Sequence, residues 1–333
     1  MKPQLFISLI LLLSFATLTS CNKKNSSVAP TAANTSSTED VNKISAGNEE
    51  KLLDSTIAAI TASLSNTNVC ERGLAISNAI VKAAHAEDCN AVSKDDLSNL
   101  RALDLHLEKS WANRIQVDKI SANMFEGLNS LEEIDLSGNM IESIDENAFK
   151  NLKSLKTLNL SNNKITSINS ATLIANTSLE SIDLSRNALT EISPKLFLGL
   201  KKLNSLNLSA NSIEVIQKDS FKDLKDLNSL DLSKNKIKKI ELGAFTGLTL
   251  TKKVKLSENS ITRIEKYNFL GLNTLETLDL SKNKITKFEA NAFRGLDHLS
   301  TLNLSHNSTR IMERFRSGLE EEVTIIGMGL VNP

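Results

Sequence analysis

Carboxylate side chains recur at one position of a repeated sequence unit, and paired carboxylates are groups that general acid–base catalysis uses. They share this position with asparagines, giving the column Asp135, Asn159, Asp183, Asn207, Asp231, Asp279 and Asn303. Oxygen ligands in such a row would also suit Ca²⁺. A catalytic pair would be singular, however, whereas this column repeats along the chain. We therefore interpret it as the polar outer face of a set of strands, in which asparagine reduces the repulsion between like charges.

The histidines offer no alternative chemistry. They are His85, His106, His298 and His306. None is placed near a cysteine or a serine in a way that suggests nucleophilic catalysis. His298 and His306 lie on opposite sides of one predicted strand and its turn, so we do not expect them to share a metal. The sequence predicts no enzyme, no metal site and no cofactor.

The elements that must position these side chains come from a repeat of 24 residues. Its clearest copy runs from Leu227 to Leu250, and the unit reads LxxLxLSxNxIxxIxxxxFxGL. The asparagine of the unit recurs without a slip in spacing at Asn139, Asn163, Asn187, Asn211, Asn235, Asn259, Asn283 and Asn307. Such a fixed interval predicts a repeat architecture.

Each unit contributes one short strand and a return segment to a shared core. Leu227, Leu230 and Leu232 are expected on the inward side of the strand, and the later isoleucine, phenylalanine and leucine add further inward anchors. Burying seven such side chains yields on the order of 10–20 kcal/mol. Ordering the chain costs roughly 1.5 kcal/mol for each residue of the unit, and the sum over the whole unit exceeds this gain. One unit cannot fold alone, so the units must stack as a solenoid of parallel strands. The repeated asparagine is predicted to form a ladder that satisfies inward-turned backbone groups at the bend after each strand.

This pattern resembles the typical 24-residue class of the leucine-rich repeat family. The resemblance implies an α/β fold: a curved leucine-rich repeat solenoid with parallel strands on its concave face and a small helical N-terminal cap. The residue two after the repeated phenylalanine is expected to have a positive φ, because only glycine, asparagine and aspartate stand there. These residues are Gly127, Asn151, Gly199, Asp223, Gly247, Gly271 and Gly295.

The amino terminus resembles a bacterial lipoprotein signal. An apolar run from Leu5 to Leu18 follows Lys2 and is too short for a comfortable membrane span. It ends in LTSC, which resembles the lipobox. The resemblance implies that residues 1–20 are removed and that Cys21 is the lipidated first residue; an ordinary secretory signal and a retained helix are the alternatives. Asn22 stands where an aspartate would imply retention in the inner membrane, which favours the outer membrane, on its periplasmic side or at the cell surface.

Between this signal and the repeats we expect a tether and a cap. Residues 21–48 are rich in small polar side chains and are predicted to be disordered. Residues 49–99 carry apolar side chains at helical spacing and would cover the end of the solenoid. One helix is predicted from Glu49 to Leu64, and a second, weaker one between Cys70 and Cys89. In an exported protein Cys70 and Cys89 are predicted to form a disulfide. Two separate buried thiols are the alternative, because a straight helix between them would hold the sulfur atoms apart.

The repeats occupy residues 100–322 and a C-terminal cap occupies residues 323–333. The first unit, 100–130, contains an insertion around Trp111, which is expected to pack under this loop rather than face a partner. The sixth regular 24-residue unit, which is coil seven when the long first unit is counted as coil one, departs from the pattern at its strand, where Lys253 and Lys255 flank a valine. A weaker, more basic strand is expected there.

Binding is the function that remains, because stacked parallel strands offer an extended concave surface. Acidic and basic residues balance at 39 each, so composition does not favour nucleic acid as a partner. The outward side chains depart from a uniform polar face only at a basic edge, defined by Arg186, Lys234, Lys236, Lys253, Lys255, Lys282 and Lys284. This edge would attract an acidic protein surface or an anionic envelope polymer, unless it is an ordinary solvated face.

The sequence thus predicts a monomeric, non-enzymatic lipoprotein that binds a protein partner outside the cytoplasm. It would contact the membrane only through the lipid on Cys21. The alternative is a structural envelope or adhesion component, with near-uniform repeats selected for shape and without a discrete partner.

Overall fold

The computed structural model describes residues 69–72, 74–106, 116–308 and 324–326. The chain divides into two compact units, Met1–Thr61 and Ala62–Pro333, and all described residues belong to the second. Several predictions fall outside the described residues: the signal with Cys21, the tether, the helix expected from Glu49, the loop around Trp111 and most of the C-terminal cap.

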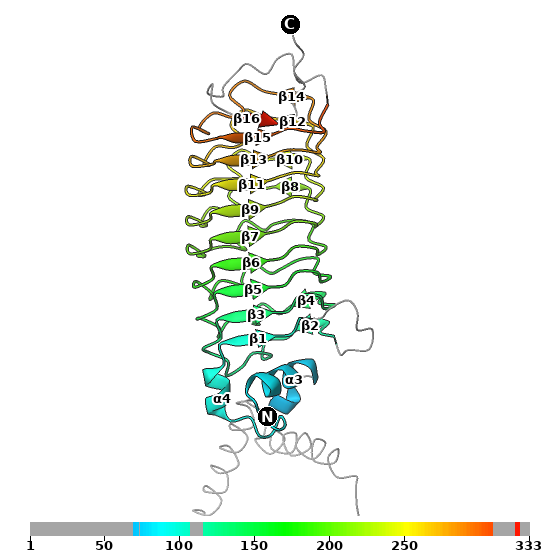
Figure 1. Cartoon of the computed structure of the whole chain (residues 1–333), viewed down its shortest axis with the longest axis vertical. Helices are drawn as coiled ribbons and strands as arrows, with labels where there is room; N and C mark the ends of the chain where they lie inside the picture. Colours follow the sequence, from blue (N-terminus) through cyan, green and yellow to red (C-terminus); the bar gives the residue numbers. More distant parts are fainter. Residues whose placement is uncertain (1–68, 73, 107–115, 309–323, 327–333) are drawn as a thin grey trace, which may run out of the picture. The chain divides into compact units, whose positions relative to one another are not determined.

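A single sheet of ten parallel strands runs through the repeats (Figure 1). In spatial order its strands are β1 (Ala102–Asp104), β3 (Glu133–Asp135), β5 (Thr157–Asn159), β6 (Ser181–Asp183), β7 (Ser205–Asn207), β9 (Ser229–Asp231), β11 (Lys253–Lys255), β13 (Thr277–Asp279), β15 (Thr301–Asn303) and β16 (Thr324–Ile326). Equivalent residues of successive units pair, as Leu206 does with Leu230 and Leu230 with Val254. The predicted solenoid of stacked parallel strands is confirmed.

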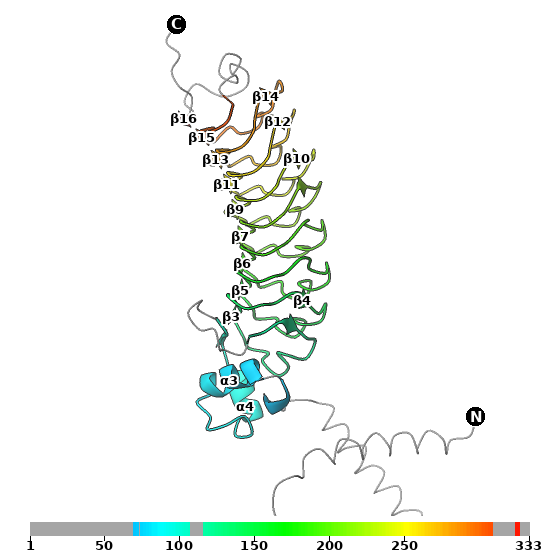
Figure 2. The ribbon, with the colours of Figure 1, turned by 90° about the vertical axis from the view of Figure 1, so that its right-hand side faces the viewer.

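Shorter strands lie across the core from this main sheet (Figure 2). They are β2 (Lys119–Ile120), β4 (Ser143–Ile144), β8 (Val215–Ile216), β10 (Lys239–Ile240), β12 (Arg263–Ile264) and β14 (Lys287–Phe288). They pair in parallel as β2 with β4, β8 with β10, and β12 with β14. Each coil therefore has a strand face, which is the outward side of the main sheet, and a return side, which carries a short strand in six of the described coils.

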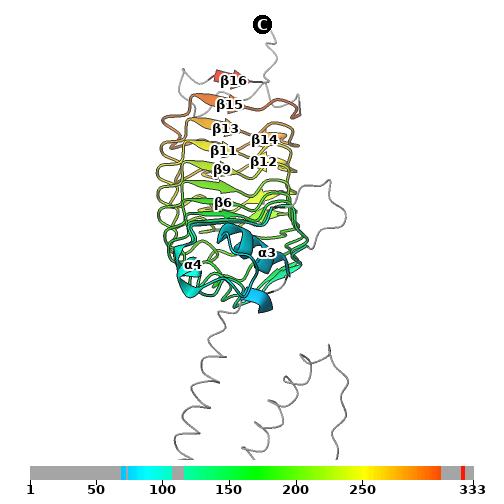
Figure 3. The ribbon, with the colours of Figure 1, turned by 60° about the horizontal axis from the view of Figure 1, so that its bottom comes forward.

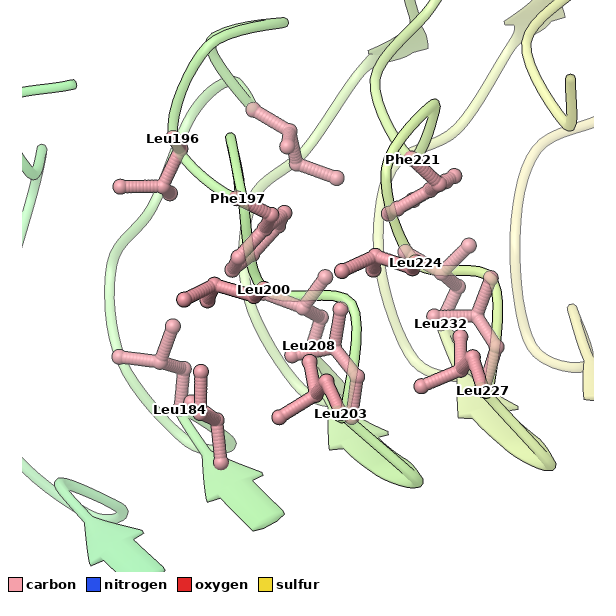
Figure 4. Packing of buried hydrophobic residues seen from close by; sticks show 14 of the residues in the cluster. Leu184, Leu196, Phe197, Leu200, Leu203, Leu208, Phe221, Leu224, Leu227 and Leu232 are labelled. Atoms are coloured by element: carbon pink, nitrogen blue, oxygen red, sulfur yellow. The ribbon is translucent and has the colours of Figure 1, made fainter. Parts of the chain in front are cut away.

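The core between the two sides is a column of leucines, isoleucines and stacked phenylalanines. From Phe197 to Phe293 the repeated rings follow one another with centroids 5.7–6.3 Å apart. Figure 4 shows Phe197 above Leu203 and Leu208, and Phe221 above Leu227 and Leu232, which are strand leucines of the following unit. Leu173 takes the phenylalanine position in one coil and is 2% exposed, so the ring stack is interrupted there while the core stays filled.

The described part of the N-terminal cap contains one turn and two helices at the β1 end of the sheet (Figure 3). They are η1 (Val69–Glu71), α3 (Leu74–Ala83) and α4 (Lys94–Asn99). Ile76 and Ile80 of α3 and Leu97 of α4 are buried in the same hydrophobic core as the repeats. The helix between the cysteines was predicted, whereas α4 was not. Its signal was the sequence from Ser93 to Asp96, whose side chains cap each other's backbone N–H groups.

The two cysteines of the cap are brought together by a chain reversal. Helix α3 ends before His85, which has a φ of 52°. The backbone N–H of Ala86 donates to the carbonyl of Val81, a bond of the kind that closes a helix end. The chain then returns, and Cys70 and Cys89 lie with their Cα atoms 5.2 Å apart and their sulfur atoms 2.10 Å apart. The straight helix that would have separated the two sulfurs is absent between these residues.

The predicted positive φ after each phenylalanine holds for the glycines only. Gly247 and Gly271 have φ values of 98° and 108°, and an added Cβ would lie 2.0 Å and 2.6 Å from a backbone carbonyl oxygen. Asn151 and Asp223 do not have a positive φ, so the prediction was wrong for both. Both residues have another backbone conformation, and the carboxylate of Asp223 accepts a hydrogen bond from the N–H of Gly199.

Candidate binding surface

The asparagines at the ends of the strands join each coil to the one before it. The side-chain amide of Asn211 donates to the carbonyls of Leu184 at 2.9 Å and Leu208 at 3.1 Å. Its oxygen accepts from the N–H of Leu189 at 3.0 Å. The other members of the predicted ladder make equivalent bonds: Asn139, Asn163, Asn187, Asn235, Asn259, Asn283 and Asn307. These bonds fix the turn that presents the basic edge.

The residue before each ladder asparagine is in the left-handed region in all eight units. The set is Gly138, Asn162, Arg186, Ala210, Lys234, Glu258, Lys282 and His306, with φ between 52° and 75°. Arg186, Lys234 and Lys282 belong to the predicted basic edge. The sequence gives no sign of this conformation, because most of these residue types do not favour it. The bonds of the ladder impose it from the neighbouring positions.

The carboxylate and amide column has a structural role on the strand face. Asp183 accepts a hydrogen bond from the N–H of Ser185 two residues on, and the same bond recurs in other coils. The second oxygen of Asp183 accepts from the side-chain amide of Asn207 at 3.1 Å. Asp135 and Asn159 form the same pair. The alternation of aspartate and asparagine is therefore a set of specific hydrogen bonds between coils, which goes beyond the reduced repulsion that the sequence suggested.

Lys253 and Lys255 flank the buried Val254 on β11 and project from the strand face. The ammonium of Lys255 lies 3.1 Å from the carboxylate of Asp231. Lys255 thus takes the place of the asparagine that pairs with aspartate in other coils. Lys255 is a longer, charged side chain than asparagine, but β11 still pairs in register with β9 and β13.

The rest of the basic edge is spread along the turns after the strands. Arg186, Lys234 and Lys282 occupy alternate coils, and strands about 4.8 Å apart place them about 10 Å from one another. Glu258 stands between the two lysines, and its carboxylate lies 3.3 Å from the ammonium of Lys282. Within the described residues no ion pair involves Arg186, Lys234, Lys236, Lys253 or Lys284. The structure thus brings the predicted residues onto one side of coils four to eight, partly neutralised and without close clustering.

Elsewhere the strand face neutralises its own charges. The carboxylate of Glu132 lies 2.6 Å from the ammonium of Lys156 and 3.3 Å from the guanidinium of Arg101. The hydrogen bond from Lys156 lowers the pKa of Glu132, and the same contact raises the pKa of Lys156. Exposed pairs of this kind add little stability. They do leave few unpaired charges for a ligand on these coils.

One contact on this face involves groups that can do chemistry. His106 Nδ1 lies 2.6 Å from Ser137 Oγ. The sequence did not suggest this contact, since the two residues belong to different coils. Nucleophilic catalysis also needs a group that orients the base, and no third partner contacts the His106 ring among the described residues. Over the same residues there is no group of three or more His, Cys, Asp or Glu side chains that could hold a metal, and no helix is long and apolar enough to cross a bilayer.

Two family models match the repeats. The model for leucine rich repeats matches residues 249–308, and the model for the BspA type leucine rich repeat region matches residues 109–228. A comparison with curated protein sequences finds no match.

Several solved structures share the fold. The TLR13–ssRNA13 complex aligns at 30% identity with a TM-score of 0.61, over 71% of this chain and 33% of the other. A leucine-rich repeat protein of Leptospira interrogans aligns at 28% identity with a TM-score of 0.57, over 70% of this chain and 57% of the other. An octameric complex of latrophilin 3, Unc5D and FLRT2 aligns at 23% identity with a TM-score of 0.58, over 69% of this chain and 70% of the other. The chain thus spans about a third of the first relative and just over half of the second.

Proposed function

Since this chain folds as a leucine-rich repeat solenoid, we propose that it is a non-enzymatic module that binds a protein partner outside the cytoplasm. The observation that carries the proposal is the main sheet, whose ten strands present rows of outward side chains over a continuous surface. Repeat proteins use such surfaces for binding. The neighbouring structure with FLRT2 is itself a complex of several proteins, which supports a protein partner by analogy of fold.

The basic edge is the part of this surface that we propose for the partner. Its lysines on coils six to eight face outward, and the carboxylates of Asp231 and Glu258 pair with two of them. The cations that remain would attract an acidic protein surface or an anionic envelope polymer. Such attraction weakens as salt rises, because the Debye length falls below about 10 Å above 0.1 M. One neighbouring structure contains single-stranded RNA. We propose no nucleic acid for this chain, because its 39 basic and 39 acidic residues cancel.

A charge reversal tests the edge. Changing Lys234, Lys253 and Lys282 to glutamate should abolish capture of the partner from an envelope extract, with little change in the thermal unfolding midpoint. The matched control reverses three exposed lysines away from the edge, Lys150, Lys195 and Lys222, and should keep capture. If the first variant captures the partner as well as the wild type does, the basic edge is not the binding site, and the loop around Trp111 is the next candidate.

We also propose that the module is anchored through a lipid on Cys21 and lies at the outer membrane. The support is the sequence LTSC at the end of an apolar run and the absence of an aspartate after Cys21. Acyl chains on both the sulfur and the amine of Cys21 would hold the protein at the bilayer without a spanning helix. A tether from residue 22 to 48 would then separate the solenoid from the surface by roughly 30 Å on average.

A structural role in the envelope is the second candidate, and the internal pairing of the strand face favours it. The asparagine ladder, the Asp–Asn pairs and the cross-coil ion pairs satisfy polar groups within the solenoid itself. A pull-down with the soluble chain that starts at residue 49 separates the two candidates. A stoichiometric protein partner supports the binding module, whereas retention by cell-wall or matrix material alone supports the structural role.

A further inference from the structure

Tyr267 is a bulky residue in a backbone conformation that suits small or polar residues. It follows β12 on the return side, and its φ is 63°. The residues at the same position in neighbouring coils are Asp219, Gly243 and Asn291, with φ values of 61°, 83° and 61°. Glycine, aspartate and asparagine tolerate this region, whereas a large side chain is strained in it. Residues held in such strained conformations cluster at functional sites.

Core packing does not explain the tyrosine. The phenylalanines of the coils fill the interior, and the ring of Tyr267 lies outside their stack and is only half-buried. Its ring contacts two cations instead. The ammonium of Lys266 lies 4.7 Å from the ring centroid, and the guanidinium carbon of Arg294 lies 5.9 Å from it. Arg294 Nη1 is also 3.5 Å from the phenolic oxygen.

The two cations at the ring are available to an anion. Within the described residues neither Lys266 nor Arg294 takes part in an ion pair. The nearby Arg263 is different, because its guanidinium contacts the carboxylates of both Glu265 and Glu289. Glu289 also accepts a hydrogen bond from the backbone N–H of Lys266, so its oxygens are already engaged. The hydrogen bond from the Lys266 side chain lowers the pKa of Tyr267, as expected for a phenol among uncompensated cations.

Exposed leucines stand beside these groups in the repeat. Leu242 occupies the position of Lys266 in the preceding coil and is 60% exposed. Leu270 follows Tyr267 by three residues, occupies the position of Arg294 in the preceding coil and is 48% exposed. Tyrosine and arginine are residues that dominate binding energy at protein interfaces. The strand face, in contrast, has no aromatic side chain in any of its regular coils.

We propose that Tyr267, Lys266 and Arg294, with Leu242 and Leu270, form a docking surface for an acidic segment of a protein. The cations would pair with carboxylates, and the ring and the leucines would contact the apolar side chains between them. The leucines favour a protein segment over an anionic polysaccharide, because a polysaccharide has no aliphatic side chains to cover them. This surface lies on the return side, so it is separate from the basic edge and does not depend on it.

The single tyrosine of the chain makes the site directly observable. The full chain in detergent, labelled with ¹³C in the tyrosine ring, gives NMR signals from Tyr267 alone. The probe is a synthetic peptide of alternating glutamate and leucine. We expect a saturable shift of the ring signals that weakens as salt is raised. A peptide with glutamine in place of glutamate is the control and should give no shift.

Two variants separate binding from folding. Tyr267→Asn places at this position the residue found at Asn291, so it should raise the thermal unfolding midpoint and at the same time abolish binding of the peptide, followed by calorimetry. Arg294→Ala should weaken binding about tenfold. Lys287→Ala removes an exposed cation from the coil of Arg294 and should leave the affinity unchanged.

Each other outcome has a defined meaning. Peptide binding that is equal in the wild type, Tyr267→Asn and Arg294→Ala would refute the docking surface, as would the absence of any ring shift. A ring shift with alginate and none with the peptide would also overturn it, in favour of a polysaccharide site. If the basic-edge variant loses the native partner while Tyr267→Asn retains both partner and peptide, the proposed function stands and the docking surface falls.

Discussion

Replacement of Asn211 by alanine tests how far the ladder stabilises the solenoid. Asn211 is 8% exposed, and its side chain accepts from the N–H of Leu189 and donates to the carbonyls of Leu184 and Leu208. These two carbonyls also accept from the side-chain amides of Asn187 and Asn235, the neighbouring members of the ladder. Alanine leaves the N–H of Leu189, a residue that is 2% exposed, without its partner, while each of the two carbonyls loses one of its two amide donors. A buried unsatisfied group costs about 1–3 kcal/mol. With one group left unpaired, we expect a loss of about 1–3 kcal/mol of unfolding free energy.

The neighbouring serine supplies the matched control. The backbone N–H of Ser212 donates to the carbonyl of Leu189 at 2.8 Å, and this bond survives a change of side chain. Ser212→Ala should therefore change the stability by no more than about 0.5 kcal/mol.

Urea denaturation followed by circular dichroism measures both variants. We expect a lower midpoint for Asn211→Ala with an unchanged slope, which indicates lost stability rather than a different unfolded state. A separate early transition is also consistent, because coils in a solenoid are stabilised mainly by their neighbours. Equal midpoints for the two variants would refute the claim that the ladder satisfies otherwise unpaired groups.

Three further changes test other parts of the chain. Cys21→Ser should release the protein from membranes, and mass spectrometry of the wild type should find a lipidated Cys21 at the mature amino terminus; an unmodified terminus elsewhere contradicts this. Intact mass should show that Cys70 and Cys89 are oxidised, and, with a sequence separation of 19, their reduction should cost about 3 kcal/mol; free thiols in the native protein would contradict the bond. Ala210→Gly should raise the free energy of unfolding by about 0.5–1 kcal/mol. A left-handed alanine costs about 1–2 kcal/mol, and the greater entropy of glycine in the unfolded chain cancels about half of the gain from removing that cost. A lower unfolding midpoint would contradict this prediction.

The parts of the fold that could be predicted from the sequence are those in which residue type and position coincide in every coil. Leu227, Leu230 and Leu232 are all fully buried, as the strand pattern requires. Asparagine at the bend predicted a side chain that bonds to the backbone, because few residue types carry both donors and an acceptor on a short stem. Repetition makes such signals strong, since each unit restates the same constraint.

Other features lack a sequence signal because the neighbouring coils determine them. The left-handed residue before each ladder asparagine is an arginine in one coil, an alanine in the next and a lysine in the third, as at Arg186, Ala210 and Lys234. Hydrogen bonds of the neighbouring ladder positions fix this backbone conformation, so the type of residue at the position does not reveal it. The opposite error occurred at Asn151 and Asp223, where a residue preference suggested a conformation that the surroundings do not impose.

Departures from the repeat therefore carry functional information only when the structure gives them no internal role. Asn176 replaces a core leucine and is fully buried, and its amide nitrogen donates to the carbonyls of Phe149 and Leu152, which gives it a role inside the solenoid although its Oδ1 has no hydrogen-bond partner among the described residues. Tyr267 is different, because its backbone position suits asparagine better and its ring contributes nothing to the core. A residue that lowers the stability of the fold and does not fill the core is retained for a contact with a binding partner at the surface. By that criterion the return side around Tyr267 is a stronger place to look for a partner than the uniform, internally paired strand face.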